Sequence, residues 1–202
     1  MVTDWLALGE RLVIPRPQDN LDMQAEILTA ETPKELLDRT LKVHPWGLTE
    51  RDWFAWAVAV VLAQGNSKKR IAKMTWEITR ELLGSGLLDR NEFNDSLEVL
   101  AVFSQGKGDR HEARRLARAH GKEASIQLSR KKEGTRYYSL VGFSLAMEAM
   151  MSQDIAMVAY HAARSAIAVA HARALDLSEP ELEQVRSFLF SEVVPLILEA
   201  IA

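Results

Sequence analysis

Four polar residues fall in one sector of an alanine-rich segment, residues 154–175, and their side chain types could do chemistry. At about 100° per residue on a helix, this polar stripe consists of Asp154, His161, Arg164 and His171. Histidine changes charge near neutral pH and serves as an acid, a base or a metal ligand, and arginine binds anions. The polar stripe is therefore a candidate for ligand binding or catalysis.

The polar stripe has a structural and a functional interpretation. In the structural interpretation its side chains face solvent or form buried hydrogen bonds to other helices. In the functional interpretation they line a groove for a partner, a small ligand or a substrate around His161, Arg164 and His171. His161 and His171 are ten residues apart, too distant along one helix to share a metal ion without ligands from other elements. Glu148 could assist, but the spacing does not require it. We therefore assign no metal ligand.

The strongest asymmetry of charge lies in residues 107–136. This segment holds ten basic and four acidic residues, so it carries +6, whereas the whole chain of 202 residues carries −3 and the remainder −9. Helical spacing gathers five of the basic residues into a cationic face, namely Arg110, Arg114, Arg115, Arg118 and Lys122. We predict that this face binds a protein partner with an acidic surface, and the acidic remainder of the chain is the other surface that a protein partner could contact. The alternatives are a solvated surface and a nucleic-acid contact through phosphates, with Tyr137 and Tyr138 stacking on bases.

Established catalytic and cofactor-binding motifs are missing. The sequence has no P-loop and no G-x-G-x-x-G after a strand, and His111-Glu112 does not continue as H-E-x-x-H because Arg115 occupies the last position. The lack of cysteine excludes thiol nucleophiles and cysteine-ligated metals. We therefore predict no catalytic residue and no cofactor. Binding is favoured over catalysis, although an enzyme around the polar stripe stays an alternative.

The expected location is the cytoplasm of a bacterium. The N-terminus has no basic region before an apolar stretch, so it does not look like a signal peptide. The richest apolar run, residues 53–63, is far shorter than the roughly 20 residues of a membrane helix. No membrane partner is predicted.

The elements that must position these residues are all helical. No segment alternates with the two-residue period of a strand, and short connections favour antiparallel neighbours. The prediction is an all-α helical bundle or a short irregular α-solenoid of antiparallel hairpins. Four prolines in the first quarter indicate an irregular N-terminal arm with short helices, residues 1–47, before a main helical domain, residues 48–202.

The predicted helices are bounded by capping residues and by glycine. They span residues 3–11, 20–28, 33–43, 48–63, 68–83, 89 or 91 to 104, 110–130, 137–151, 155–175 and 178 to the end of the chain. Predicted N-caps include Thr32, Ser67, Asp109 and Ser178, and Pro195 should kink the last helix or end it one turn later. The tryptophans between residues 46 and 76 are expected to pack in the core.

Two segments carry a resemblance to a known class of protein. Residues 160–174 read YHAARSAIAVAHARA, and residues 114–120 read RRLARAH. The first is similar to the A-x-A-x-A-H helices of some all-α immunity proteins from bacterial polymorphic toxin systems. The resemblance covers less than a quarter of the chain and transfers no site residues. It implies a non-enzymatic protein that binds and neutralises one cognate toxin.

Overall fold

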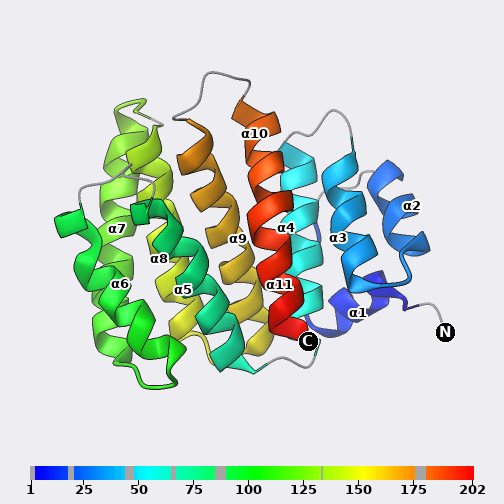
Figure 1. Cartoon of the computed structure of the whole chain (residues 1–202), viewed down its shortest axis with the longest axis horizontal. Coiled ribbons are helices and arrows are strands. Elements are labelled where there is room, and N and C mark those ends of the chain that lie inside the picture. Colours follow the sequence, from blue (N-terminus) through cyan, green and yellow to red (C-terminus); the bar gives the residue numbers. More distant parts are fainter. Residues whose placement is uncertain are drawn as a thin grey trace.

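A computed structural model describes residues 3–17, 21–43, 48–64, 67–84, 90–132, 134–175 and 181–202. These residues form helices and no strand, which confirms the predicted all-α class (Figure 1). The helices are α1 (Trp5–Arg11), α2 (Leu21–Thr29), α3 (Pro33–Lys42), α4 (Leu48–Ala63), α5 (Lys68–Gly84), α6 (Arg90–Ser104), α7 (Arg110–Ser129), α8 (Thr135–Met151), α9 (Ile155–Ala174), α10 (Glu181–Phe188) and α11 (Val194–Ile201). None of them combines the length and the hydropathy needed to cross a bilayer.

Three of the predicted N-caps are confirmed. The Thr32 hydroxyl accepts from the Glu35 amide at 3.1 Å, and the Ser67 hydroxyl accepts from the Arg70 amide at 3.2 Å. Asp109 begins α7 by accepting from the His111 amide at 2.8 Å. These bonds satisfy amides that have no partner within the helix. The predicted cap at Ser178 lies outside the described residues.

The C-terminal helix contains a π-helical turn, Leu189–Val193, between α10 and α11. The turn comes directly before Pro195, whose ring excludes the regular carbonyl contact with the preceding turn and which has no amide to donate. A wider turn accommodates both effects. The sequence analysis predicted that Pro195 would kink this helix or end it one turn later. The irregularity is the π-helical turn just before the proline, and the helix continues beyond it to Ile201.

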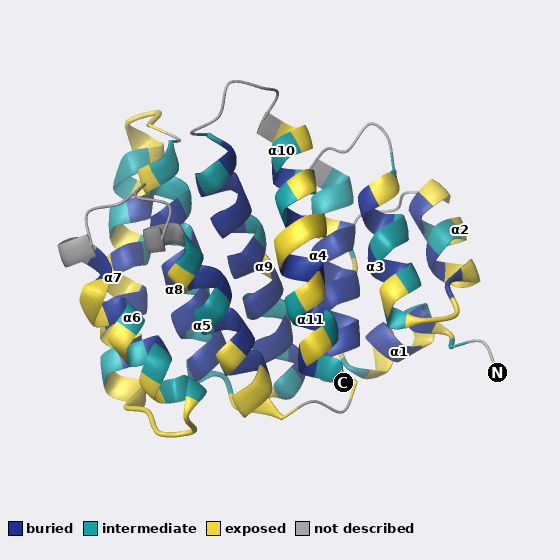
Figure 2. Ribbon diagram, in the orientation of Figure 1, coloured by how far each residue is buried: buried dark blue, intermediate teal, exposed yellow. Residues whose placement is uncertain are grey.

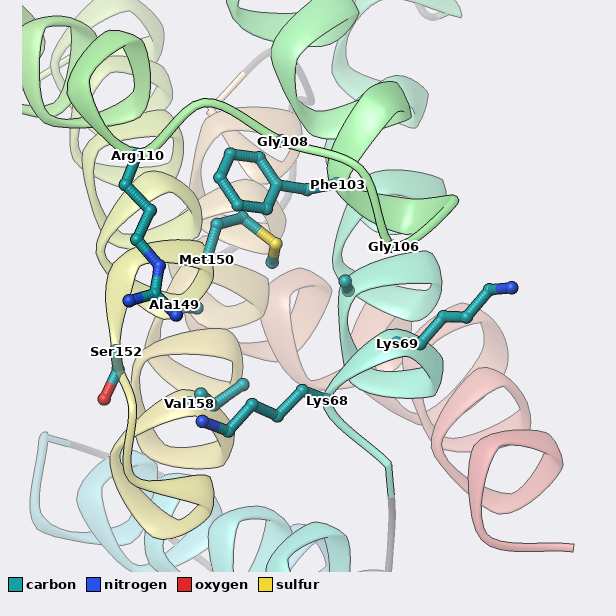
Figure 3. Close-up of a pocket in the computed structure, with 11 residues that line it drawn as sticks. Lys68, Lys69, Phe103, Gly106, Gly108, Arg110, Ala149, Met150, Ser152 and Val158 are labelled. Carbon is teal, nitrogen blue, oxygen red and sulfur yellow. The ribbon is translucent and has the colours of Figure 1, made fainter.

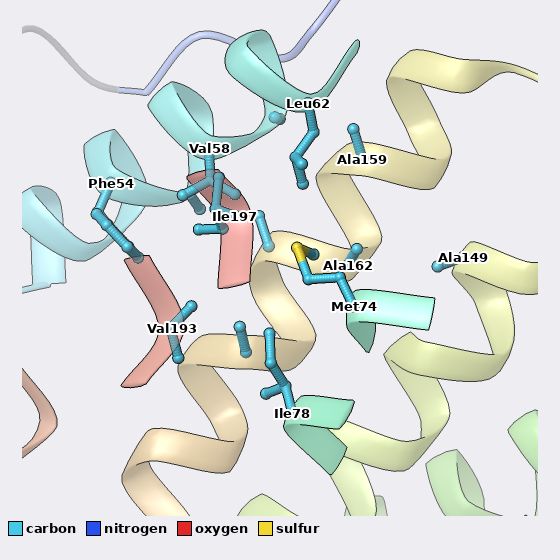
Figure 4. Packing of buried hydrophobic residues seen from close by; sticks show 14 of the residues in the cluster. Phe54, Val58, Leu62, Met74, Ile78, Ala149, Ala159, Ala162, Val193 and Ile197 are labelled. Carbon is cyan, nitrogen blue, oxygen red and sulfur yellow. The ribbon is translucent and has the colours of Figure 1, made fainter. Parts of the chain in front are cut away.

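Helix α9 occupies the centre of the fold and contacts α4, α5, α8 and α10 (Figure 1). Ala159, Ala162 and Ala166 are buried, and such small side chains allow neighbouring helices to approach closely. Figure 4 shows larger side chains from α4 and α5 filling the space around them, among them Leu62 and Met74. The burial of α9 along nearly its whole length is visible in Figure 2.

The first three helices pack onto the same core. Trp5, Leu8 and Ile27 belong to one cluster of buried residues together with Trp53 and Trp56 of α4. The Trp5 indole donates to the Ala30 carbonyl at 2.9 Å, and the rings of Trp53 and Trp56 meet edge to face at 5.5 Å between centroids. The expected core packing of these α4 tryptophans is confirmed, whereas Trp46 lies outside the described residues. Residues 1–47 thus include helices that are continuous with the core.

Candidate functional site

The cationic face lies on the outer side of α7, at one end of the helical array (Figure 1). The opposite side of α7 buries Ala113, Leu116 and Ala117, and α7 packs mainly against α8. Since buried and exposed sectors alternate with the helical period, burying the small residues turns the basic ones outward. All five predicted residues are exposed, namely Arg110, Arg114, Arg115, Arg118 and Lys122.

Hydrogen bonds on the buried side fix how α7 is rotated about its axis. His120 Nε2 lies 2.6 Å from the Ser96 hydroxyl, and its ring stacks on Phe93 at 5.4 Å. The Ser144 hydroxyl of α8 donates to the Ala117 carbonyl at 3.1 Å. These buried contacts hold the cationic face toward solvent.

Among the residues that the structure describes, only one of the five cations has an ion-pair partner. Arg115 donates from Nε and Nη2 to the two carboxylate oxygens of Glu112, at 2.9 and 2.6 Å. This hydrogen-bonded guanidinium holds the pKa of Glu112 below its ordinary range. The remaining four form no ion pair with any residue that the structure describes, and they are Arg110, Arg114, Arg118 and Lys122. Four positive charges on one face are thus available to a partner.

The polar stripe of α9 is divided among different environments. Asp154 is the N-cap of α9 and accepts from the Ala156 amide at 2.8 Å, which is a structural role. His161 faces α8, where its Nδ1 lies 3.4 Å from a carboxylate oxygen of Glu148. His171 is buried near the other end of the helix. The structure therefore does not bring His161 and His171 into one site.

His161 has a shifted pKa. Its side chain is 21% exposed, and Nδ1 is buried without a hydrogen bond to a described residue. Burial lowers the pKa of His161, the Glu148 carboxylate opposes that change, and Arg164 lowers the pKa further. The imidazole is therefore held in its neutral form below the pH at which a free histidine would take up a proton.

This shift predicts a loss of stability in acid. The unfolded chain binds a proton at His161 more readily than the folded chain, so the free energy of unfolding falls as the pH drops below about 6.5 and levels off below the lowered pKa. Urea titrations between pH 7.5 and 5 should show this slope in the natural protein and a smaller one in His161→Gln. Glu148→Gln should steepen the slope. Identical slopes in all three proteins would contradict the assignment.

Arg164 and His171 meet at an open cavity of about 230 Å³ between α4, α8 and α9. The His171 ring stacks on Tyr138 with 4.7 Å between centroids, and Arg51 of α4 contacts its Nε2. Arginine only donates, so Nε2 of His171 accepts and the ring proton of the neutral form is on Nδ1. Because Tyr138 is stacked on His171, it faces α9 and not the cationic face of α7.

A second cavity, of about 350 Å³, involves residues that sequence reasoning did not select (Figure 3). It lies where α5 and α7 begin and the connection between α8 and α9 passes, and Lys68, Phe103 and Met150 are among its lining residues. Arg110 belongs both to this cavity and to the cationic face. Sequence alone gave no signal because the lining comes from segments that are remote in the chain.

No group of three or more histidine or carboxylate side chains in the described part of the chain is arranged to hold a metal ion. Comparison with family models, curated proteins and solved structures finds no match to this chain. The function of the protein is therefore inferred from the geometry of its helices and from their charges.

Proposed function

We propose that this protein is a non-enzymatic interaction module that binds an acidic protein surface through the cationic face of α7. The observation that carries the proposal is the set of four exposed cations without ion-pair partners among the described residues. A rigid basic face attracts an acidic partner over a distance and accelerates association. The rest of the chain carries −9, which disfavours the approach of acidic surfaces elsewhere.

The kind of partner that we propose is a cognate bacterial toxin, neutralised in the cytoplasm by direct binding. The all-α architecture and the resemblance of the α9 sequence to immunity proteins support this choice. Neutralisation by binding needs a preformed surface and no catalytic group. The buried contacts of His120 and Ser144 give α7 such a surface.

A nucleic-acid partner is the competing interpretation of the same charges. Proteins that bind single strands combine a basic groove with aromatic side chains on which bases stack. Tyr138 is instead stacked on His171, and Tyr137 meets Tyr138 edge to face at 5.0 Å. The tyrosines line the cavity beside α9, so this pair does not accompany the cationic face. This arrangement favours a protein partner.

Binding of neighbouring gene products tests the proposal. Each product is co-expressed with the tagged natural chain and with Arg114→Glu/Arg118→Glu, and the complexes are purified at low salt. We expect one neighbour to co-purify with the natural chain and not with the variant. A labelled DNA duplex and a labelled single-stranded RNA are titrated in parallel. Tight binding of either, weakened by salt and by the variant, without any protein partner, would overturn the proposal in favour of nucleic acid.

A further inference from the structure

The cavity beside the start of α7 is bounded by segments remote in sequence. They include Lys68 and Lys69 of α5, Phe103 of α6, Arg110 at the start of α7, and Met150 and Ser152 at the end of α8. Its volume of about 350 Å³ lies within the range of roughly 300–1,000 Å³ that small-molecule sites occupy.

The charged residues that the structure describes around the cavity are all basic. They are Lys68, Lys69 and Arg110, and none of the described lining residues is a carboxylate. Figure 3 shows Arg110 and Lys68 extending toward the α8–α9 connection, whereas Lys69 points away from them. Lys68 Nζ donates to the Gln153 carbonyl, and an ammonium has further hydrogens to donate. Arg110 has no ion-pair partner among the described residues.

The rest of the cavity is apolar. The rings and chains of Phe103, Met150 and Val158 face it together (Figure 3). The Phe103 ring lies directly against the backbone of Gly108, where an added Cβ would come within 2.5 Å of Cδ1. Glycine at this position is therefore what allows the ring to form a wall of the cavity.

We propose that this cavity binds an anionic amphiphile, a small molecule with a carboxylate or phosphate headgroup on an alkyl chain. The headgroup lies between Arg110 and Lys68, where both side chains supply donors and positive charge. The alkyl chain lies against Phe103 and Met150, whose apolar surface is removed from water on binding. This ligand goes beyond the proposed partner of the cationic face, with which the cavity shares Arg110.

The competing account gives the two cations a purely structural role. Basic side chains near a helix C-terminus bind its last carbonyls and interact favourably with its dipole, and Arg110 and Lys68 lie beside the end of α8. Under that account the cavity takes up no ligand. Removing either charge would then lower stability without affecting the binding of any anion.

Methyl NMR of the full chain, labelled at methionine, distinguishes the two accounts. The probes are two anionic amphiphiles, decanoate and decyl phosphate. A first control, decyltrimethylammonium, has the same alkyl chain with a positive headgroup. A second control, acetate and inorganic phosphate, has the anionic headgroups without the alkyl chain. We expect the chemical shift of the Met150 methyl group to change saturably when either anionic amphiphile is added, and to stay unchanged with both controls. Equal shifts with the cationic amphiphile, or equal affinity for acetate and decanoate, would overturn the proposal, and so would no shift with any probe. The stronger of the two anionic probes identifies the headgroup class.

Three single substitutions locate the binding. Arg110→Met and Lys68→Met keep the aliphatic stem and should each weaken decanoate binding about tenfold, because each removes one charge-assisted contact. Lys122→Met removes the same charge at another position on α7 and should leave the affinity unchanged. Equal affinity in all four proteins would contradict the assignment. In Arg114→Glu/Arg118→Glu we expect decanoate binding to persist while partner binding is lost, so the two proposals fail separately.

Discussion

Replacing Trp56 by alanine should lower the free energy of unfolding by about 3–5 kcal/mol, the usual cost of removing a large aromatic side chain from a close-packed core. Trp56 is 1% exposed and packs edge to face on Trp53. Trp56 also contacts α1, where the buried backbone of Gly9 lies against the indole ring. Urea unfolding followed by far-ultraviolet circular dichroism measures the change without relying on tryptophan fluorescence.

Gly9→Ala tests the same contact from the other side. A Cβ at Gly9 would overlap the Trp56 ring, so we expect the substitution to cost about 1–3 kcal/mol through overpacking. The double variant should be no less stable than Trp56→Ala alone, because the smaller side chain leaves room for the new methyl group. Costs that simply add would contradict the docking of α1 on α4.

Gly121→Ala is the matched control for the comparison of Gly9→Ala, Trp56→Ala and the double variant. Gly121 also lies within a helix, so both alanine substitutions gain the same helical propensity. The nearest atom to its added Cβ is the Ser144 hydroxyl oxygen, at 3.4 Å, and no ring is displaced. We expect Gly121→Ala to leave stability unchanged or raise it by up to about 1 kcal/mol.

Reversing two charges of the cationic face should weaken the partner complex about 100-fold. Arg114→Glu/Arg118→Glu replaces two attractions, each worth up to about 1 kcal/mol at an exposed site, with two repulsions of similar size. Both side chains are exposed and make no ion pair with a described residue, so the fold should keep its stability. Calorimetry with the purified partner gives the affinity, and thermal unfolding of the free chain gives the stability.

The control for net charge is Lys34→Glu/Lys73→Glu. These lysines are 62% and 56% exposed and lie on α3 and α5, so the control changes the formal charge by the same amount on other surfaces. We expect its affinity for the partner to stay within threefold of that of the natural chain. An equal loss in both double variants would assign binding to the overall charge and not to α7.

The helices of this protein could be predicted because the capping interactions that set their ends involve residues close together in the sequence. Thr32 and Asp109 each bond to amides within three residues, so a short window of sequence contains the whole interaction. The outward direction of Arg114 and Arg118 followed from helical spacing combined with the small residues that alternate with them. Local rules of this kind need no knowledge of distant segments.

The surroundings of the polar stripe could not be predicted from such local rules. Spacing alone grouped His161 with His171, but each ring is placed by a different neighbour, Glu148 of α8 for one and Arg51 of α4 for the other. Helical periodicity states which residues share a side of α9, not which helices lie opposite them. The cavity lined by Lys68 and Arg110 could not be predicted for the same reason, because packing between remote segments forms it.

Growth rescue in bacteria tests the central claim most directly. Each neighbouring gene product is expressed alone, with the natural chain, and with Arg114→Glu/Arg118→Glu at matched soluble levels. The account predicts that one neighbour arrests growth, that the natural chain restores it, and that the variant does not. It would be contradicted if no neighbour were toxic, or if the variant rescued growth as fully as the natural chain.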